Sequence, residues 1–509
     1  MTLSRAEGLS IDRIVRRGAA RAPDRAAIVI PGARAITYAE LELAASRFAA
    51  RLRADGAQAG DRVILGNCNT PEFFIAFFGA ARAGLVAVPL DTNLAPAEFA
   101  NVFAHAQPFA AVIDDRSRAA FAPLGGARYE HTSLVAGAAS GATLDDQLPD
   151  ADPSCDPRSP ALIIYTSGTT GTQRGAVHSH AGIQQKVDTI NGWSQLAEGA
   201  RTLCMLPTHF GHGLVCACLA TFNLAGTLIL CRPFDVELLP QVFALADAHA
   251  VETFSTVPSI VRLLLRNHVI AAPRTGTLRY VTCASAPLHP EEATAFEARF
   301  GVPLLNCYGI TEGGTWSAMS PRDPVARDSR SVGTAVGCRF RAVDATGCEL
   351  PAGSIGELQL SGPSVMLGYY KDPLGTERVL RDGWLVTGDL GAVDGDGRVY
   401  LAGRSKDLII RAGANIYPAE IEGVLLRHPG LAEAYVVGLE HPILGEQVAA
   451  CVVLKDGAAL ADRDLRAHCL QFLAAYKCPE RIQFVDAVPK TSRGKVSSAS
   501  VRALFRAPT

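Results

Sequence analysis

The chain has 509 residues, too many for one compact core, so we expect two or more domains. It is 48% hydrophobic and 19% charged, which is ordinary for a globular enzyme and excludes a disordered chain. The formal net charge is −2 without any block of like charge, which argues against nucleic acid or an anionic membrane as the main partner.

The N-terminal segment has no long apolar run, so it does not read as a secretory signal. A mitochondrial-type presequence is the alternative, but Glu7, Asp12 and Asp24 are unusual in such a segment. The 13 cysteines show no disulfide or metal-ligand spacing. We therefore expect reduced, buried thiols in a cytoplasmic protein.

Two apolar stretches, residues 73–90 and 213–230, are long enough to be candidate membrane spans. The first contains Arg82, and the second is interrupted by Asn223 and Gly226. Each is better explained as a buried helix followed by a strand, so we expect no transmembrane segment.

Helical patterns alternate with short β-branched runs over most of the chain, as in residues 99–115, 239–258 and 290–309. This alternation predicts parallel sheets covered by helices, with ligands at the carboxyl ends of the strands. After about residue 331 the runs indicate short antiparallel strands. The tail then predicts a small α+β unit with helices over 417–429 and 462–476 and strands over 433–440, 447–455 and 481–486.

The run "ALIIY" predicts a buried strand, and the loop "TSGTTGTQRG" follows it directly. Glycines allow close backbone approach, successive N–H groups can hold an anion, and Arg174 would add a bidentate cation. A solvated Ser/Thr/Gly loop without a ligand is the alternative. The loop lacks the GxxxxGK[ST] pattern, so it is not a Walker loop.

"YTSGTTGTQRG" resembles the phosphate-loop signature of the adenylate-forming superfamily, with Gln173 and Arg174 where proline and lysine are usual. Four further motifs occur in the family's order: "YGITE", "GWLVTGDLG", "GRVYLAGRSKDLIIRAGAN" and "VPKTSRGKV". The hinge motif resembles that of acyl-CoA ligases more than that of peptide-synthetase adenylation domains. The resemblance implies α/β architecture: a large N-terminal domain of helix-covered sheets with a small β-barrel-like subdomain, then a small mobile α+β C-terminal domain.

The resemblance implies that a carboxylate attacks the α-phosphate of ATP, and that the thiol of coenzyme A then displaces AMP from the acyl-adenylate. Both reactants of the first step are anions, so positive charge and alignment matter most. The implied catalytic residues are Lys495, Thr311 and Arg174, and Glu312 would bind Mg²⁺. The implied nucleotide site further comprises Thr166, Ser167, Gly168, Thr169, Thr170, Gly171, Ser285, Ala286, Pro287, Asn306, Tyr308, Gly309, Asp389 and Arg404.

Lys406 occupies the family's hinge position, which predicts an N-terminal domain over 1–405 and a C-terminal domain over 406–509. The C-terminal domain would alternate between two poses. One pose would deliver Lys495 for adenylation, and the other would bring Gly413 to the tunnel for the thiol. A small residue at position 413 would permit close approach of the pantetheine arm.

His209, Phe210, His212 and Trp316 are the expected residues of the acid pocket. Trp316 would fill volume that a long acyl chain needs, which favours a short, branched or compact cyclic acid. The alternatives are a core or gating role for the histidines and a Trp316 that is turned into the core. No general base is assigned, because a carboxylate nucleophile needs none.

Three functions remain open at this point. The first is an acyl-CoA synthetase that uses ATP, Mg²⁺ and coenzyme A. The second is a stand-alone enzyme that loads an acyl carrier protein, and the third is a non-catalytic ATP-binding homologue. Glu312, Asp389 and Lys495 are all present, which argues against the third. The sequence does not identify the acid, and it leaves open whether the chain forms a homodimer.

Overall fold

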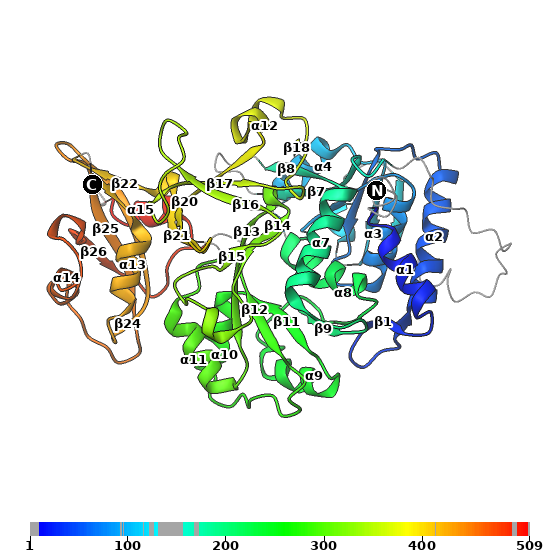
Figure 1. The fold of residues 1–509 in the computed structure, drawn as a ribbon, viewed down its shortest axis with the longest axis horizontal. Helices are drawn as coiled ribbons and strands as arrows, with labels where there is room; N and C mark the ends of the chain where they lie inside the picture. The colour runs from blue at the N-terminus through cyan, green and yellow to red at the C-terminus, as the bar shows by residue number, and fades with distance from the viewer. Residues whose placement is uncertain are drawn as a thin grey trace. The chain divides into compact units, whose positions relative to one another are not determined.

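The computed structural model of the chain describes residues 10–91, 94, 96–115, 117–121, 127–130, 156–166, 173–412, 414–490 and 496–506. The chain divides into two compact units (Figure 1). The first comprises residues 1–339 and 360–385, and the second comprises residues 340–359 and 386–509. The predicted α/β class is confirmed, whereas the domain boundary at Lys406 stays a prediction.

A nine-stranded sheet in the first unit has the order β15-β14-β13-β12-β11-β9-β10-β1-β2. The strands from β1 through β13 along this order are parallel, and β2, β14 and β15 are antiparallel to their neighbours. The strands are β1 (Ala26–Val29), β2 (Ile36–Thr37), β9 (Arg201–Cys204), β10 (Thr227–Leu230), β11 (Thr253–Thr256), β12 (Tyr280–Cys283), β13 (Leu304–Ile310), β14 (Thr315–Met319) and β15 (Thr334–Ala335).

Helices α9 (Val242–Ala248), α10 (Pro258–Arg266) and α11 (Pro290–Phe300) alternate with the strands of this sheet. Figure 1 shows α10 and α11 side by side. Arg262 on α10 and Glu292 on α11 form an ion pair of 2.5 Å between Nε and Oε1. The short turns η4 (Thr311–Gly313) and η5 (Pro324–Ala326) follow β13 and β14.

A seven-stranded sheet in the same unit has the order β18-β8-β7-β4-β3-β5-β6. Strands β7, β4, β3, β5 and β6 are parallel, and β8 and β18 are antiparallel to their neighbours. The strands are β3 (Arg62–Gly66), β4 (Val86–Pro89), β5 (Ala110–Ile113), β6 (Ala127–Glu130), β7 (Pro160–Thr166), β8 (Arg174–Ser179) and β18 (Gly368–Tyr369).

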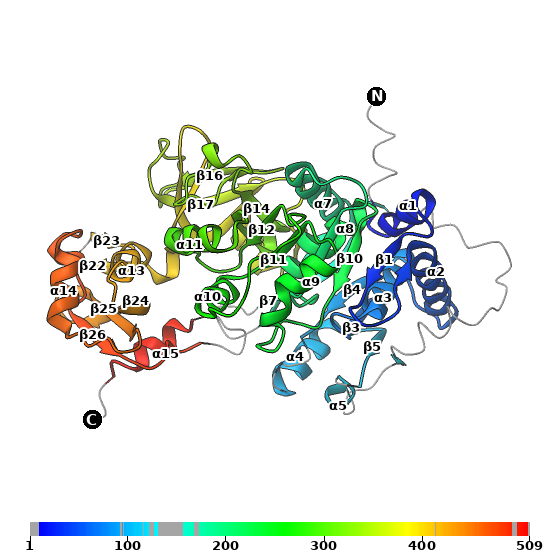
Figure 2. The same ribbon diagram turned by 90° about the horizontal axis from the view of Figure 1, so that it is seen from below.

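The first unit contains further helices, of which α2 and α3 lie side by side in both views (Figures 1 and 2). The helices are α1 (Arg13–Arg21), α2 (Tyr38–Ala54), α3 (Pro71–Arg82), α4 (Pro96–Ala106), α5 (Arg118–Phe121), α7 (His180–Ser194), the π-helix η2 (His212–Leu219), α8 (Ala220–Asn223), η3 (Leu239–Gln241) and α12 (Pro373–Val379).

The two apolar stretches form a helix followed by a strand, as predicted. Residues 73–90 form most of α3 and then β4, and residues 213–230 form most of η2, then α8 and β10. The buried Arg82 at the end of α3 pairs with Glu42, with 2.8 Å between Nη2 and Oε2. Within the described ranges, no helix is long and apolar enough to cross a membrane.

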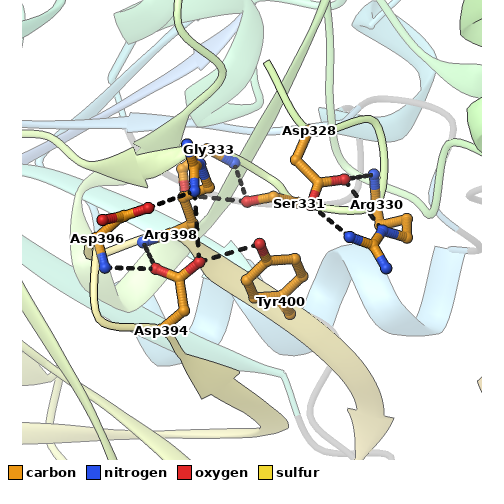
Figure 3. A network of polar contacts seen from close by, with 8 residues as sticks. All are labelled: Asp328, Arg330, Ser331, Gly333, Asp394, Asp396, Arg398 and Tyr400. Carbon is orange, nitrogen blue, oxygen red and sulfur yellow. Dashed lines mark hydrogen bonds and ion pairs between the residues drawn. The ribbon is translucent and has the colours of Figure 1, made fainter. Parts of the chain in front are cut away.

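Strands β16 (Arg339–Val343), β17 (Gly356–Ser361), β19 (Leu380–Arg381), β20 (Trp384–Val393) and β21 (Val399–Arg404) form a five-stranded sheet. Figure 3 shows the turn of the β20–β21 hairpin, where the carboxylate of Asp394 accepts hydrogen bonds from the Arg398 backbone N–H and the Tyr400 hydroxyl. It also shows the loop before β15 in the first unit, where Asp328 pairs with Arg330.

The second unit also contains the predicted α+β tail. Its strands β22 (Ile409–Arg411), β23 (Ala414–Ile416), β24 (Leu431–His441), β25 (Gly445–Leu454) and β26 (Arg481–Phe484) form one sheet. The accompanying helices are η6 (Ser405–Asp407), α13 (Pro418–Leu426), α14 (Asp462–Leu470), η7 (Ala475–Lys477) and α15 (Ser498–Ala503). The helix predicted to reach Tyr476 ends at Leu470, and the extended backbone at Ala474 (φ −61°, ψ 146°) excludes a continuous helix as far as Tyr476.

Candidate active site

The β7–β8 hairpin carries the predicted phosphate loop. Thr166 at the end of β7 lies opposite Arg174 at the start of β8, and the Thr166 hydroxyl donates to the Arg174 carbonyl at 3.4 Å. The two ends of the loop are therefore held one strand spacing apart. Ser167, Gly168, Thr169, Thr170 and Gly171 lie outside the described residues.

Arg174 lies beside two side chains from the segment around β18. Its Nε is 3.4 Å from Asp372 Oδ2, and its guanidinium carbon is 5.3 Å from the centre of the Tyr369 ring. Because β18 pairs with β8, the position of Tyr369 is fixed by the same hairpin that carries Arg174. The loop cation thus has a carboxylate and an aromatic face as neighbours.

Tyr369 connects Arg174 to the predicted metal ligand. Its hydroxyl donates a hydrogen bond of 2.8 Å to Glu312 Oε1, and the Glu312 carbonyl accepts from the Met366 N–H at 2.8 Å. Burial and the neighbouring Glu312 carboxylate raise the pKa of Tyr369, so its phenol stays a donor. Sequence reasoning missed Tyr369, although the aromatic pair in "GYYKD" was visible.

The segment Asn306–Glu312 runs along β13 into η4, and so places Asn306, Tyr308, Gly309, Thr311 and Glu312 in sequence at one end of the sheet. Strands β12 and β13 are adjacent and parallel, with Cys283 opposite Asn306. The turn with Ser285, Ala286 and Pro287 follows β12 and therefore begins beside Asn306. Gly309 lies opposite Trp316, where a Cβ atom would be 1.9 Å from the Thr315 carbonyl oxygen.

His212 and Trp316 meet next to the Ser285 turn. The His212 Nδ1 is 3.0 Å from Ser285 Oγ, and its ring centre is 5.1 Å from that of Trp316. Burial lowers the pKa of His212 to about 3, so the imidazole is neutral at neutral pH and offers no charge to a substrate carboxylate. Trp316 is 4% exposed.

Trp316 also contacts Trp193 in an edge-on arrangement, with 6.4 Å between ring centres. Both rings line a cavity together with Asn191, Tyr280, Ser255 and Thr282. Trp316 therefore contacts His212 and also forms part of the wall of this cavity. A smaller residue at position 316 would enlarge the cavity.

His209 and Phe210 contact a different set of residues from His212 and Trp316. The His209 Nδ1 is 3.3 Å from Cys68 Sγ, and its Nε2 is 3.6 Å from Asp91 Oδ2. The Phe210 ring packs on His209, with 4.1 Å between ring centres. Of the four residues expected in the acid pocket, the structure groups His212 with Trp316, and His209 with Phe210.

The second unit carries the remaining predicted residues. Asp389 on β20 lies opposite Arg404 on β21, and their side chains form an ion pair of 2.9 Å between Oδ1 and Nε. Asp389 is buried, and Arg404 is about half exposed. Lys406 is exposed in η6.

Gly413 and Lys495 lie outside the described residues, but their flanking residues are described. Arg411 pairs with Ala414 across the β22–β23 turn, where Ala412 has a left-handed φ of 47°. Lys490 bridges to Val496 around the lysine loop, and its ammonium lies 3.0 Å from Glu433.

No group of three or more His, Cys, Asp or Glu side chains is arranged to hold a metal ion within the described part of the chain. Glu312 is a hard oxygen donor of the kind Mg²⁺ prefers, and Tyr369 takes up one of its oxygens. A cation at Glu312 would therefore take most of its ligands from ATP phosphates and water, which is how Mg²⁺ is usually held in nucleotide sites.

Comparison with known proteins agrees with these features. Residues 15–370 match the AMP-binding enzyme family, and residues 420–495 match the AMP-binding enzyme C-terminal domain. The chain is 34% identical to a sulfoacetate–CoA ligase of Cupriavidus necator, over 94% of each chain. It is 33% identical to a feruloyl-CoA synthase of Amycolatopsis sp, over 96% of this chain and 98% of the relative.

Among solved structures, ATP-bound MatB from Rhodopseudomonas palustris superposes with a TM-score of 0.86 at 31% identity, over 97% of this chain and 99% of that one. The matched family covers the phosphate-loop hairpin, the β13–η4 segment and Tyr369. The chain therefore belongs to the AMP-binding enzyme family, in its CoA ligase branch.

Proposed function

We propose that the chain activates a short or compact carboxylic acid with ATP and transfers the acyl group to coenzyme A. Its class is that of an AMP-forming acid–thiol ligase, the class named for its relatives over nearly their whole length. The observation that carries the proposal is the row Arg174–Tyr369–Glu312, which joins the phosphate-loop hairpin to the carboxylate after β13.

Two displacements make up the reaction. In the first, a carboxylate oxygen of the acid attacks the α-phosphorus of ATP, and pyrophosphate leaves with the bridging oxygen. In the second, the sulfur of coenzyme A attacks the acyl carbonyl carbon, the thiol proton is lost to solvent, and AMP leaves with its phosphate oxygen. Neither step changes an oxidation state.

The residue roles in the first step are proposals supported by charge and placement. Arg174 would neutralise phosphate charge at the end of the loop, and Thr311 would donate to the α-phosphate. Lys495 would approach both the acid and the α-phosphate. Glu312 would hold Mg²⁺, which when bound would neutralise phosphate charge.

The roles of the nucleotide residues are likewise proposals. Tyr308, Asn306 and the Ser285–Pro287 turn would hold the adenine. Asp389 would accept from the ribose hydroxyls, and the Arg404 ion pair supports this role because it orients the buried carboxylate. The loop residues Thr166–Gly171 would cradle the phosphates with Arg174.

The proposed size of the acid depends on Trp316. Its buried ring lies against His212 and forms part of the cavity wall, so it fills volume that a long acid would need, which supports a short, branched or compact cyclic acid. His209 and Phe210 are proposed as a second wall of the acid site.

We also propose a hinge at Lys406, an approach of Gly413 to the thiol tunnel, a homodimer and a cytoplasmic location. The cytoplasmic location is supported by the described cysteines, which are all free thiols.

Loading of a carrier protein is the second candidate function, because a fatty acid–[acyl-carrier-protein] ligase of Streptomyces coeruleorubidus is 33% identical over 95% of this chain.

Acid-dependent exchange of labelled pyrophosphate into ATP tests the first step. We expect exchange with acids of two to six carbons or with small cyclic acids, and a loss of at least tenfold for acids of twelve carbons. The enzyme loaded with its acyl-adenylate is then offered free coenzyme A or a holo-carrier protein. Absence of exchange across the whole panel would contradict the proposed function.

A further inference from the structure

Lys186 is a buried cation that the proposed reaction does not use. It lies on α7 and is 1% exposed. In the described part of the chain, no carboxylate lies within ion-pair distance of its ammonium. Burying an ammonium without a counter-charge is unfavourable, so a well-packed apolar residue would serve stability better.

The ammonium of Lys186 binds the strand that carries Trp316. Its Nζ donates to the Trp316 carbonyl at 2.5 Å and lies 3.5 Å from the Ser317 hydroxyl. The Ser317 hydroxyl in turn donates to the Thr315 carbonyl at 3.2 Å. Lys186 therefore binds the backbone of β14 at the residue whose ring faces His212.

The backbone just before Trp316 is strained. Gly314 and Thr315 both have left-handed φ angles, of 77° and 87°. A β-branched residue rarely adopts this conformation, and such strain persists only where the surroundings hold it. The contacts that hold it include Lys186 and the thiol of Cys216, which donates to Thr315 Oγ1 at 3.0 Å.

We propose that Lys186 is a positioning residue that holds β14 in this strained path and so keeps the Trp316 ring across the acid pocket. It thereby sets the length of acid that the enzyme accepts. The inference rests on the proposed function for its meaning, but the position of the Trp316 ring can be measured without any substrate.

The test is a double-mutant cycle on acid selectivity. Lys186→Met removes the ammonium and keeps the length of the side chain, and Trp316→Ala removes the ring. The measured quantity is the ratio of kcat/KM for an acid four carbons longer to that for the best acid of the panel. We expect Lys186→Met to raise this ratio about tenfold, and to change it less than about twofold when Trp316 is already alanine.

Val187→Ala is the matched control. Val187 is buried on the same helix but packs in a different core cluster from Trp316, so its truncation should lower Tm and leave the ratio unchanged. Ser317→Ala removes the second partner of the ammonium and gives a folded alternative should Lys186→Met not fold. We expect it to raise the ratio about threefold, again only when Trp316 is present.

Tryptophan emission provides the readout without substrate. The chain has three tryptophans, so Trp193→Phe and Trp384→Phe leave Trp316 as the only emitter. We expect Lys186→Met to shift its emission to the red. An unchanged ratio and unchanged emission, or the same tenfold change in the Trp316→Ala background, would overturn the role of Lys186. Absence of pyrophosphate exchange in the wild type would instead count against the proposed function.

Discussion

The hydroxyl of Tyr369 joins two groups that belong to separate sequence motifs. It donates to Glu312 while its ring lies beside Arg174, so it fixes the carboxylate oxygen that it binds and leaves the other to face a cation. A carboxylate that is oriented in this way loses less freedom when it binds a metal. We therefore propose that Tyr369 belongs to the nucleotide site, although the proposed reaction gives it no proton to transfer.

Replacing Tyr369 with phenylalanine should weaken binding of magnesium ATP. A hydrogen bond to a charged group contributes about 1.5 kcal/mol, so we expect the KM for magnesium ATP to rise roughly tenfold with a smaller change in kcat. Steady-state kinetics at several Mg²⁺ concentrations measure this. Tyr370→Phe is the control, because Tyr370 packs on His105. Equal KM values for both variants would contradict the role of Tyr369.

Candidate site residues that belong to a sequence motif could be predicted. Residues whose role depends only on a contact in the folded chain could not. Arg174, Glu312 and Asp389 each stand in an ordered motif, and the sequence identified them as candidates. Lys186 and Tyr369 have no such spacing, since Tyr369 is placed by the pairing of β18 with β8 and Lys186 meets β14 through the packing of helix α7. The different surroundings of His209 and His212 were hidden for the same reason.

At the scale of the helices and strands, the periodicity of hydrophobic residues along the sequence predicted the type of most elements. It did not predict that η2 is a π-helix, because an apolar run has no periodicity that distinguishes an α-helix from a π-helix. Nor did it locate the end of α14 at Leu470, where the apolar pattern continues past the helix. Such ends are set by local backbone geometry rather than by periodicity.

Helix α13 should make the stability of the second unit depend on pH. Burial raises the pKa of Glu422 to about 7, against the pull of the Val436 N–H, which donates to its carboxylate at 2.8 Å. The folded state therefore binds this proton more tightly than the unfolded state. The resulting stability is present below about pH 4.5 and is lost as the pH rises through 7.

We expect the free energy of opening of α13 to fall by roughly 2–3 kcal/mol between pH 5 and pH 8. Glu422→Gln, which mimics the protonated acid, should abolish this fall. Amide hydrogen exchange within Ile421–Val424, corrected for intrinsic rates, measures it. Glu420→Gln on the same helix is the control, because Glu420 pairs with Lys477 near the surface. A pH slope that persists in Glu422→Gln would refute the assignment.

At the scale of the whole molecule, the order of motifs predicted a large unit followed by a smaller one. It did not predict that residues 340–359 group with the C-terminal tail while residues 360–385 group with the first unit. Which residues form a compact unit depends on which strands pair. A single boundary in the sequence cannot describe two units that are each built from separate segments of the chain. The hinge at Lys406 therefore needs a functional test.

Two substitutions should separate the half-reactions if the C-terminal domain alternates between two poses. Lys495→Ala should lower pyrophosphate exchange by roughly 10²- to 10³-fold and spare thioester formation from added acyl-adenylate, because only the first step needs its charge. Gly413→Leu should have the opposite effect, because a side chain there would obstruct the thiol arm. Lys490→Ala, at a lysine that pairs with Glu433, is the control for charge loss near the loop. Loss of both steps together in either variant would show that one fixed arrangement serves both, since each residue would then be needed throughout the reaction.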